Sequence, residues 1–151
     1  MSHAIPCFDC VVDASVGIKL FLDEPLADRA AALFAHLCDN PPAYFYVPDL
    51  FFIECANILW KHVSRFHYPE HIALQNINDL ASLRLRPAAM QSLAEDALTL
   101  AIQHGCTTYD AAYVTLAAHL SVPLVTADEA LIRILPETEF DVRFLGDWPT
   151  L

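Results

Sequence analysis

The sequence predicts an α/β fold of three layers, in which a central, mostly parallel sheet of four to five strands is flanked by helices. Short and almost continuously apolar segments alternate along the chain with longer segments of helical periodicity. Strands buried on both faces have this continuous hydrophobicity, and helices between them allow neighbouring strands to run parallel. With 151 residues, 56% of them hydrophobic, the chain is expected to form one domain over 1–151 with a substantial core.

The first third of the chain predicts two strands separated by two helices. The β-branched run FDCVVDA (8–14) predicts a strand that enters a helix through Asp-Ala-Ser. That helix is expected over 15–24, and a second one over 25–39. The aromatic and β-branched segment AYFYVPD (43–49) predicts the next strand, which Pro48 closes.

The middle of the chain predicts two helices and a brief strand. The segment 49–67 has a broad apolar face, and Asp49 is placed to act as its N-cap. The segment 69–83 starts with Pro and Glu, which are common in the first turn of a helix. The residues RLRP (84–87) are a strand candidate.

The last third continues the alternation of helices and strands. A long helix is expected to end at His104 and Gly105, because glycine favours the backbone conformation that terminates helices. The expected elements are, in order, a helix over 88–105, a helix over 108–121, a buried strand over 122–127, a short helix over 128–135 and a final strand over 141–146.

Composition excludes several classes of function. The net charge of −11 gives no broad field that attracts nucleic acid, and three glycines provide no phosphate-binding glycine loop. No apolar run is long enough for a transmembrane helix, and the amino terminus has no Lys or Arg of a signal peptide. Five cysteines in largely apolar surroundings favour reduced thiols in the cytoplasm, and the pair Cys7 and Cys10 lacks the second pair of a zinc site.

Four carboxylates lie at the edges of these apolar elements. Asp13 ends the first strand, Asp128 follows the strand 122–127, and Asp110 lies where the helix 108–121 begins. Ligands of parallel sheets collect at the carboxyl ends of the strands, although spacing alone does not place Asp110 there. Glu54 lies on an apolar helix face, where a lone ionised carboxylate costs about several kcal/mol unless it is paired or bound to metal.

Each carboxylate also has a structural explanation. Asp13, Asp110 and Asp128 are all placed to act as helix N-caps, whereas the structural explanation is weakest for Glu54. Three aspartates at element edges together with one buried glutamate form an oxygen-only set, which suits Mg²⁺ or Mn²⁺ and does not suit zinc. The sequence therefore predicts a hard-cation site at this edge of the sheet.

Three blocks of the sequence resemble those of PIN-domain proteins, and the chain is most similar to VapC-type toxins within that family. The blocks are VVDASVGIKLFLDEP (11–25), PDLFFIECANIL (48–59) and TTYDAAYVTLAAHLSVPLVTADEAL (107–131). The resemblance implies a PIN-like α/β/α fold and a Mg²⁺- or Mn²⁺-dependent endoribonuclease. It also implies that the acidic cluster is Asp13, Glu54, Asp110 and Asp128, supported by Ser15, Asn57 and Thr126.

One position departs from the family pattern. Many relatives carry a further acidic residue three positions after the last aspartate, and Leu131 occupies that position here. One well-held metal ion is therefore expected, and a second metal site is in doubt.

The toxin resemblance implies three partners. One is a compact, structured RNA substrate, since few cations are available to bind a long unstructured one. Its backbone contacts are expected at Lys19, Lys61 and Arg65, and also at Arg84 and Arg86, unless these are ordinary solvated charges. The second partner is a protein antitoxin, docked in an apolar groove of the helices at 15–38 and 49–67. The third is a second copy of the chain in a homodimer. The apolar residues of these two helices could equally fill the core.

Two other functions are weighed against the nuclease. A Mg²⁺-dependent phosphatase with an aspartyl nucleophile requires an aspartate two residues after the first, where this chain has Ser15. A non-catalytic binding module predicts the loss of some acidic residues, and all four are present. The sequence therefore favours the nuclease.

Overall fold

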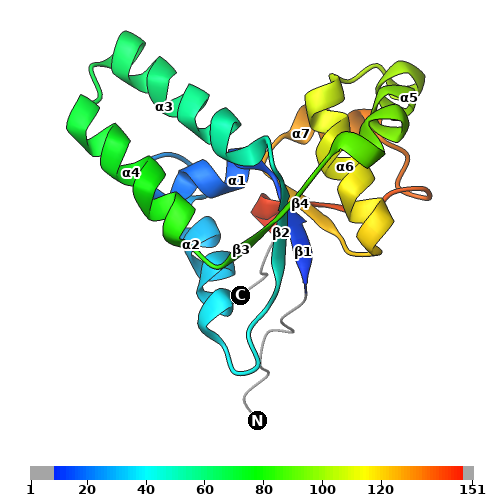
Figure 1. Ribbon diagram of the computed structural model, residues 1–151, viewed down its shortest axis with the longest axis horizontal. Helices are drawn as coiled ribbons and strands as arrows, with labels where there is room; N and C mark the ends of the chain where they lie inside the picture. The colour runs from blue at the N-terminus through cyan, green and yellow to red at the C-terminus, as the bar shows by residue number, and fades with distance from the viewer. Residues whose placement is uncertain (1–8, 148–151) are drawn as a thin grey trace.

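A computed structural model describes residues 9–147 and has a five-stranded parallel sheet at its centre (Figure 1). The strand order is β3-β2-β1-β4-β5, and every neighbouring pair is parallel. The strands are β1 (Cys10–Val12), β2 (Phe45–Pro48), β3 (Leu85–Ala88), β4 (Leu124–Thr126) and β5 (Val142–Phe144). All five predicted strands are thus confirmed: four are shorter than predicted, and β3 has the predicted length but lies one residue later. Cys7 and the rest of the amino terminus lie outside the described residues.

Helices cover both faces of the sheet and confirm the three-layer prediction. Figure 1 shows α1 to α4 on one side of the sheet and α5 to α7 on the other. The helices are α1 (Ala14–Gly17), α2 (Ala27–Ala35), α3 (Phe51–Phe66), α4 (Glu70–Ser82), α5 (Ala94–His104), α6 (Thr108–Leu120) and α7 (Glu129–Ile134). Within these layers α3 packs against α4 and α5 packs against α6. None of the helices in residues 9–147 is long and apolar enough to cross a membrane.

The centre of the sheet is buried on both faces, as its continuous hydrophobicity predicts. β1 and β4 are buried along their whole length. Helix α6 is likewise buried nearly all round, from Ala111 to Ala117, because it packs on both the sheet and α5. The core therefore lies around β1, β4 and α6, which are the elements that end or begin at Asp13, Asp128 and Asp110.

Two predicted helices were too long. The helix expected over 15–24 is the single turn α1 followed by a short 3-10 segment to Leu20, because Pro25 disfavours helix at the residue before it and Leu26 has a left-handed backbone (φ 71°). The helix expected over 88–105 begins only at Ala94. Its first predicted residue, Ala88, pairs instead with Pro48 in the sheet, since strand pairing outweighs helix propensity, even that of alanine, the best helix former.

The predicted N-cap of α3 is wrong. The helix begins at Phe51 with Leu50 in the capping position, and no side chain caps it. The backbone N–H of Asp49 continues the sheet by donating to Ala88 O (2.9 Å), so Asp49 belongs to the strand end.

A glycine allows α1 and α3 to approach closely. A Cβ at Gly17 would lie 2.6 Å from Cζ of Phe51, whose ring is fully buried. Because real Cβ atoms do not approach other atoms so closely, only glycine permits this contact without a shift of α3. The contact fixes the first turn of α3, and therefore Glu54, against the helix that follows Asp13.

Candidate metal centre

Asp13 is held at the end of β1 by two hydroxyl groups. Thr126 Oγ1 and Ser15 Oγ both donate to its Oδ2, at 2.7 and 2.8 Å. Ser15 Oγ accepts from the backbone N–H of Ala127 (3.1 Å), and Thr126 Oγ1 accepts from that of Asp128 (3.0 Å). The carboxylate occupies the N-cap position of α1 but makes no side-chain capping bond. The two hydroxyl groups therefore fix the orientation of the Asp13 carboxylate, and this carboxylate does not cap α1 through its side chain.

Asp13 is buried, and the groups that act on its carboxyl are hydroxyl groups, a backbone N–H and another acid. Its side chain is 6% exposed, and burial raises the pKa of its carboxyl. The hydroxyls of Thr126 and Ser15 and the N–H of Ala14 oppose this rise in pKa, and the charge on Asp110 adds to it.

Glu54 projects from the first turn of α3 toward α6. Tyr113 OH donates to Glu54 Oε1 at 3.0 Å, across 59 residues of sequence. The pKa of the Glu54 carboxyl is raised from 4.5 to about 7, chiefly by burial and also by the charges on Asp13 and Asp110, while the bond from Tyr113 opposes the rise. The glutamate predicted on an apolar helix face is thus half-buried and close to two other carboxylates.

Asp110 lies in the first turn of α6 and is not its cap. Thr107 is the N-cap, and its Oγ1 accepts from the backbone N–H of Asp110 at 3.1 Å. Burial raises the pKa of the Asp110 carboxyl, the bond involving Thr107 opposes the rise, and the charge on Asp128 adds to it. The N-cap explanation for Asp110 is therefore wrong, and its carboxylate faces other acids.

Asp128 does cap a helix. Its Oδ1 accepts from the backbone N–H groups of Ala130 (3.0 Å) and Leu131 (3.3 Å), which open α7. The capping explanation is thus confirmed for this residue. One oxygen is used by the cap, and the side chain still lies within electrostatic reach of Asp110.

The four carboxylates form a centre of like charge. Mutual repulsion links Asp13 with Asp110, Glu54 with both, and Asp110 with Asp128. No lysine, arginine or histidine is among the causes that lower the pKa values of Asp13, Glu54 or Asp110. Excess charge of one sign in a half-buried site favours a bound counter-ion, and an all-oxygen donor set suits a hard divalent cation.

The carboxylates are too far apart to bind one metal ion together without moving. Within residues 9–147, no group of three or more His, Cys, Asp and Glu side chains is close enough to hold a metal ion as the side chains stand. Repulsion between like charges opposes a closer arrangement of these acids in the absence of a cation. The residues fit a divalent cation in chemistry and charge, and binding would have to draw the side chains together.

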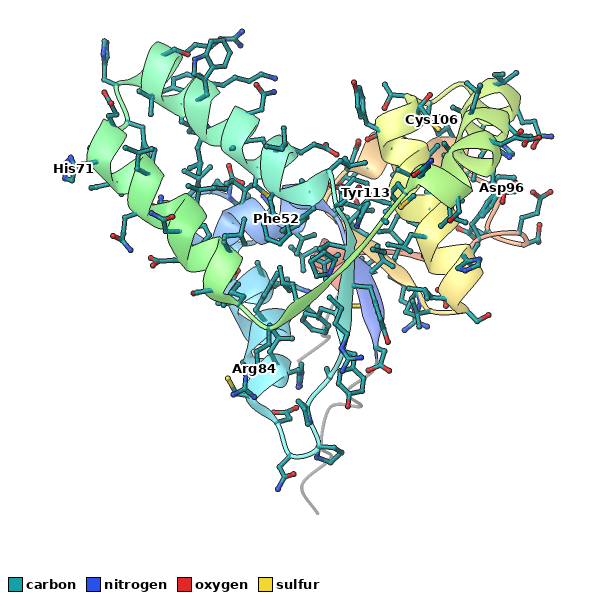
Figure 2. The ribbon with its side chains drawn as sticks, viewed as in Figure 1. Phe52, His71, Arg84, Asp96, Cys106 and Tyr113 are labelled. Carbon is teal, nitrogen blue, oxygen red and sulfur yellow. The ribbon has the colours of Figure 1, made fainter. Side chains whose placement is uncertain are left out.

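Of the other predicted site residues, some contact Asp13 and most others lie on the surface. Ser15 and Thr126 contact Asp13 directly, whereas Asn57 is exposed on α3. Lys19 forms an ion pair with Glu24 (3.0 Å), and Arg86 lies over the ring of Tyr44 with its Cζ 3.8 Å from the ring centroid. Lys61 and Arg65 are exposed on α3, and Arg84 lies at the α4–β3 turn, away from Tyr113 in Figure 2. Their contacts with RNA stay predictions.

Two residues of the centre were not predicted. Tyr113 reads in the sequence as one more apolar position of a buried helix, and Thr107 as part of a loop. The spacing T-x-x-D before an apolar run, in which Thr107 precedes Asp110, is a capping signal that could have identified Thr107. No local pattern could have found Tyr113, because its partner is 59 residues away.

Fold and site together define a three-layer α/β domain with an acidic centre at the carboxyl ends of its central strands. The sequence profile of the PIN domain matches residues 10–135. The chain belongs to the PIN domain family, as the resemblance of its three blocks indicated.

Two relatives align with most of the chain. It is 33% identical over 128 residues to Ribonuclease VapC3 of Pyrobaculum aerophilum, covering 83% of this chain and 94% of that protein. It is 31% identical over 123 residues to Ribonuclease VapC12 of Mycobacterium tuberculosis, covering 82% and 89% of the two chains.

Solved structures show the same fold. PAE2754 from Pyrobaculum aerophilum superposes with a TM-score of 0.68 at 21% identity, over 92% of this chain and 85% of that one. A chain of a toxin–antitoxin complex from Klebsiella pneumoniae superposes with a TM-score of 0.64 at 17% identity, over 91% and 98%. At these identities the likeness concerns the fold.

Proposed function

We propose that this protein is a divalent-metal-dependent endoribonuclease, the toxin of a VapC-type toxin–antitoxin pair. One observation carries the proposal: carboxylates from separate segments of the chain repel one another around the buried, hydroxyl-bound Asp13, and within residues 9–147 no cation is among the groups that lower their pKa values. The identity of 33% to a ribonuclease over most of both chains supports it.

The residues of the centre have different proposed roles. Asp13, Glu54 and Asp110 would hold Mg²⁺ or Mn²⁺, and Asp128 would reach it with the oxygen that does not cap α7, directly or through water. Ser15 and Thr126 keep Asp13 in place. When bound, the ion neutralises charge on the scissile phosphate and lowers the pKa of the attacking water.

The phosphatase alternative finds no support in this arrangement. The position two residues after Asp13 is occupied by Ser15, whose hydroxyl donates to that aspartate and accepts from the backbone of Ala127. It therefore holds Asp13 in place and supplies no second acid.

RNA cleavage by the purified chain, freed from any bound partner, tests the proposal. Total tRNA and ribosomal RNA would be incubated with Mg²⁺, with Mn²⁺ and with EDTA, alongside Asp110→Asn. We expect discrete fragments that require metal and vanish in the variant, because Asp110→Asn removes one charged metal ligand and leaves the Thr107 cap intact. Folded protein that binds metal and cleaves neither RNA would refute the activity on these substrates and favour a non-catalytic binding module.

We further propose that an antitoxin segment docks between α3 and α4. A groove of about 360 Å³ there is lined by Leu59, Trp60, Val63, Leu74 and neighbouring residues, and Trp60 is 60% exposed. This site keeps the predicted helix at 49–67, which is α3, and replaces the predicted segment 15–38 by α4. Trp60→Glu is expected to abolish co-purification of a co-expressed partner while RNA cleavage persists; retained co-purification would place the partner elsewhere.

The homodimer and the cytoplasmic location stay predictions. Ile53 and Ile102, on the helix pairs that flank the sheet, are each 74% exposed, which is compatible with a subunit interface. Light scattering of the purified chain would give its mass in solution.

A further inference from the structure

A buried tyrosine connects the two helical layers at the acidic centre. Tyr113 lies on α6, three residues after Asp110, and its side chain is fully buried. Its hydroxyl donates to Glu54 Oε1 on α3 (3.0 Å). Figure 2 shows Tyr113 near the middle of the molecule, where α3 and α6 approach each other.

Packing does not require this hydroxyl. A phenylalanine would fill nearly the same volume in the core around α6, and a buried hydroxyl costs free energy unless it is hydrogen-bonded. Tyr113 finds that bond in a half-buried carboxylate and not in a backbone carbonyl. A bond from a neutral hydroxyl to a charged acceptor is stronger than one between neutral groups, so it restricts the orientation of the carboxylate.

The bond divides the two oxygens of Glu54 between two tasks. Oε1 is held by Tyr113, which leaves Oε2 available to bind an ion or its water. Asp13 has the same division, because both hydroxyl donors reach its Oδ2. In both residues the hydroxyl donors hold a single carboxylate oxygen.

We propose that Tyr113 is a positioning residue of the centre, which fixes Glu54 so that one of its oxygens faces the metal ion. The inference rests on the proposed metal-dependent function, because it assigns the tyrosine a role toward the ion. Since Asp110 and Tyr113 are three residues apart on one helix, α6 supplies a carboxylate directly and orients a second one from α3.

Mn²⁺ titration of the full chain, by calorimetry or by the electron paramagnetic resonance of free Mn²⁺, tests this role without RNA. Tyr113→Phe is expected to weaken Mn²⁺ binding about tenfold, equivalent to about 1.4 kcal/mol. Tyr68→Phe is the matched control: Tyr68 is partly buried in the loop between α3 and α4, and its hydroxyl bonds to Asn76. We expect it to change the affinity less than about twofold, since it lies outside the centre.

A double-mutant cycle separates positioning from a general structural effect. In a Glu54→Gln background, Tyr113→Phe should have almost no further effect on Mn²⁺ affinity, because its target carboxylate is gone. Equal weakening in both backgrounds, or unchanged affinity of folded Tyr113→Phe, would overturn the proposal, as would a wild-type chain that binds no Mn²⁺. If Tyr113→Phe does not fold, Glu54→Asp, which shortens the reach to the hydroxyl, should show the same loss.

The ribonuclease proposal can fail separately. A wild-type chain that binds Mn²⁺ with the predicted dependence on Tyr113 but cleaves no RNA would refute the activity and leave the positioning role intact. Cleavage by Tyr113→Phe should recover at high metal concentration if the tyrosine acts through metal binding.

Discussion

Replacing Asp13 with asparagine is expected to reduce RNA cleavage at least about 10³-fold and, at neutral pH, to raise the melting temperature of the metal-free protein by a few degrees. The loss of activity follows from removing the charge of the most buried carboxylate in the centre. The gain in stability follows because burial raises the pKa of Asp13, so keeping it ionised in the folded state costs free energy. Asparagine retains one oxygen that can accept from Ser15 and Thr126.

The prediction is specific because Asp13→Asn should lower RNA cleavage and raise the melting temperature. Asp96→Asn, an exposed position on α5 labelled in Figure 2, serves as the control and should change neither activity nor stability measurably. Cleavage rates and thermal melts in EDTA would be measured for both variants. If Asp13→Asn lost activity and was also destabilised, Asp13 would be a structural residue whose hydroxyl network stabilises the sheet edge.

The order of elements could be predicted because it depends on local patterns. Short buried strands and amphipathic helices differ in periodicity, and the parallel arrangement follows from their alternation. The ends of the elements were less predictable. The residues from Ala88 to Leu93 favour helix by themselves, but Ala88 pairs with Pro48 in the sheet, and Gln91–Leu93 form a 3-10 turn before α5 begins at Ala94.

The candidate site was predictable to the extent that topology determines it. Asp13 and Asp128 follow the adjacent strands β1 and β4, so their proximity follows from a parallel sheet. The capping role of Asp128 was also predictable, because the residue stands directly before a helical segment, and the T-x-x-D spacing signals the cap at Thr107. The bond from Tyr113 to Glu54 depends on how α6 packs beside α3, and this packing is a property of the whole fold.

Raising the pH from about 4.5 to about 7 is expected to destabilise the metal-free protein, in contrast to the common rise in stability over this range. Glu54 has a pKa of 4.5 when unfolded and about 7 when folded, so across this interval the folded state binds more protons than the unfolded state. Stability therefore falls with increasing pH, and the contribution is fully present only below the unfolded pKa. Asp13 and Asp110 also make stability fall as the pH rises above 3.8, their ordinary pKa, because folding raises the pKa of both.

Thermal melts in EDTA between pH 4.5 and 8 would measure this effect, with Glu54→Gln and the exposed Glu95→Gln as a matched pair. Glu54→Gln should flatten the decline and be more stable than wild type at pH 8, while Glu95→Gln should follow the wild-type curve. Added Mn²⁺ should stabilise the wild type more as pH rises, because protons and the ion compete for the same oxygens. A metal-free protein that becomes more stable up to pH 7 would show that the carboxylates are already compensated. The case for a cation at the centre would then lose its electrostatic basis, since that case depends on acids that the fold brings together and leaves without a counter-charge.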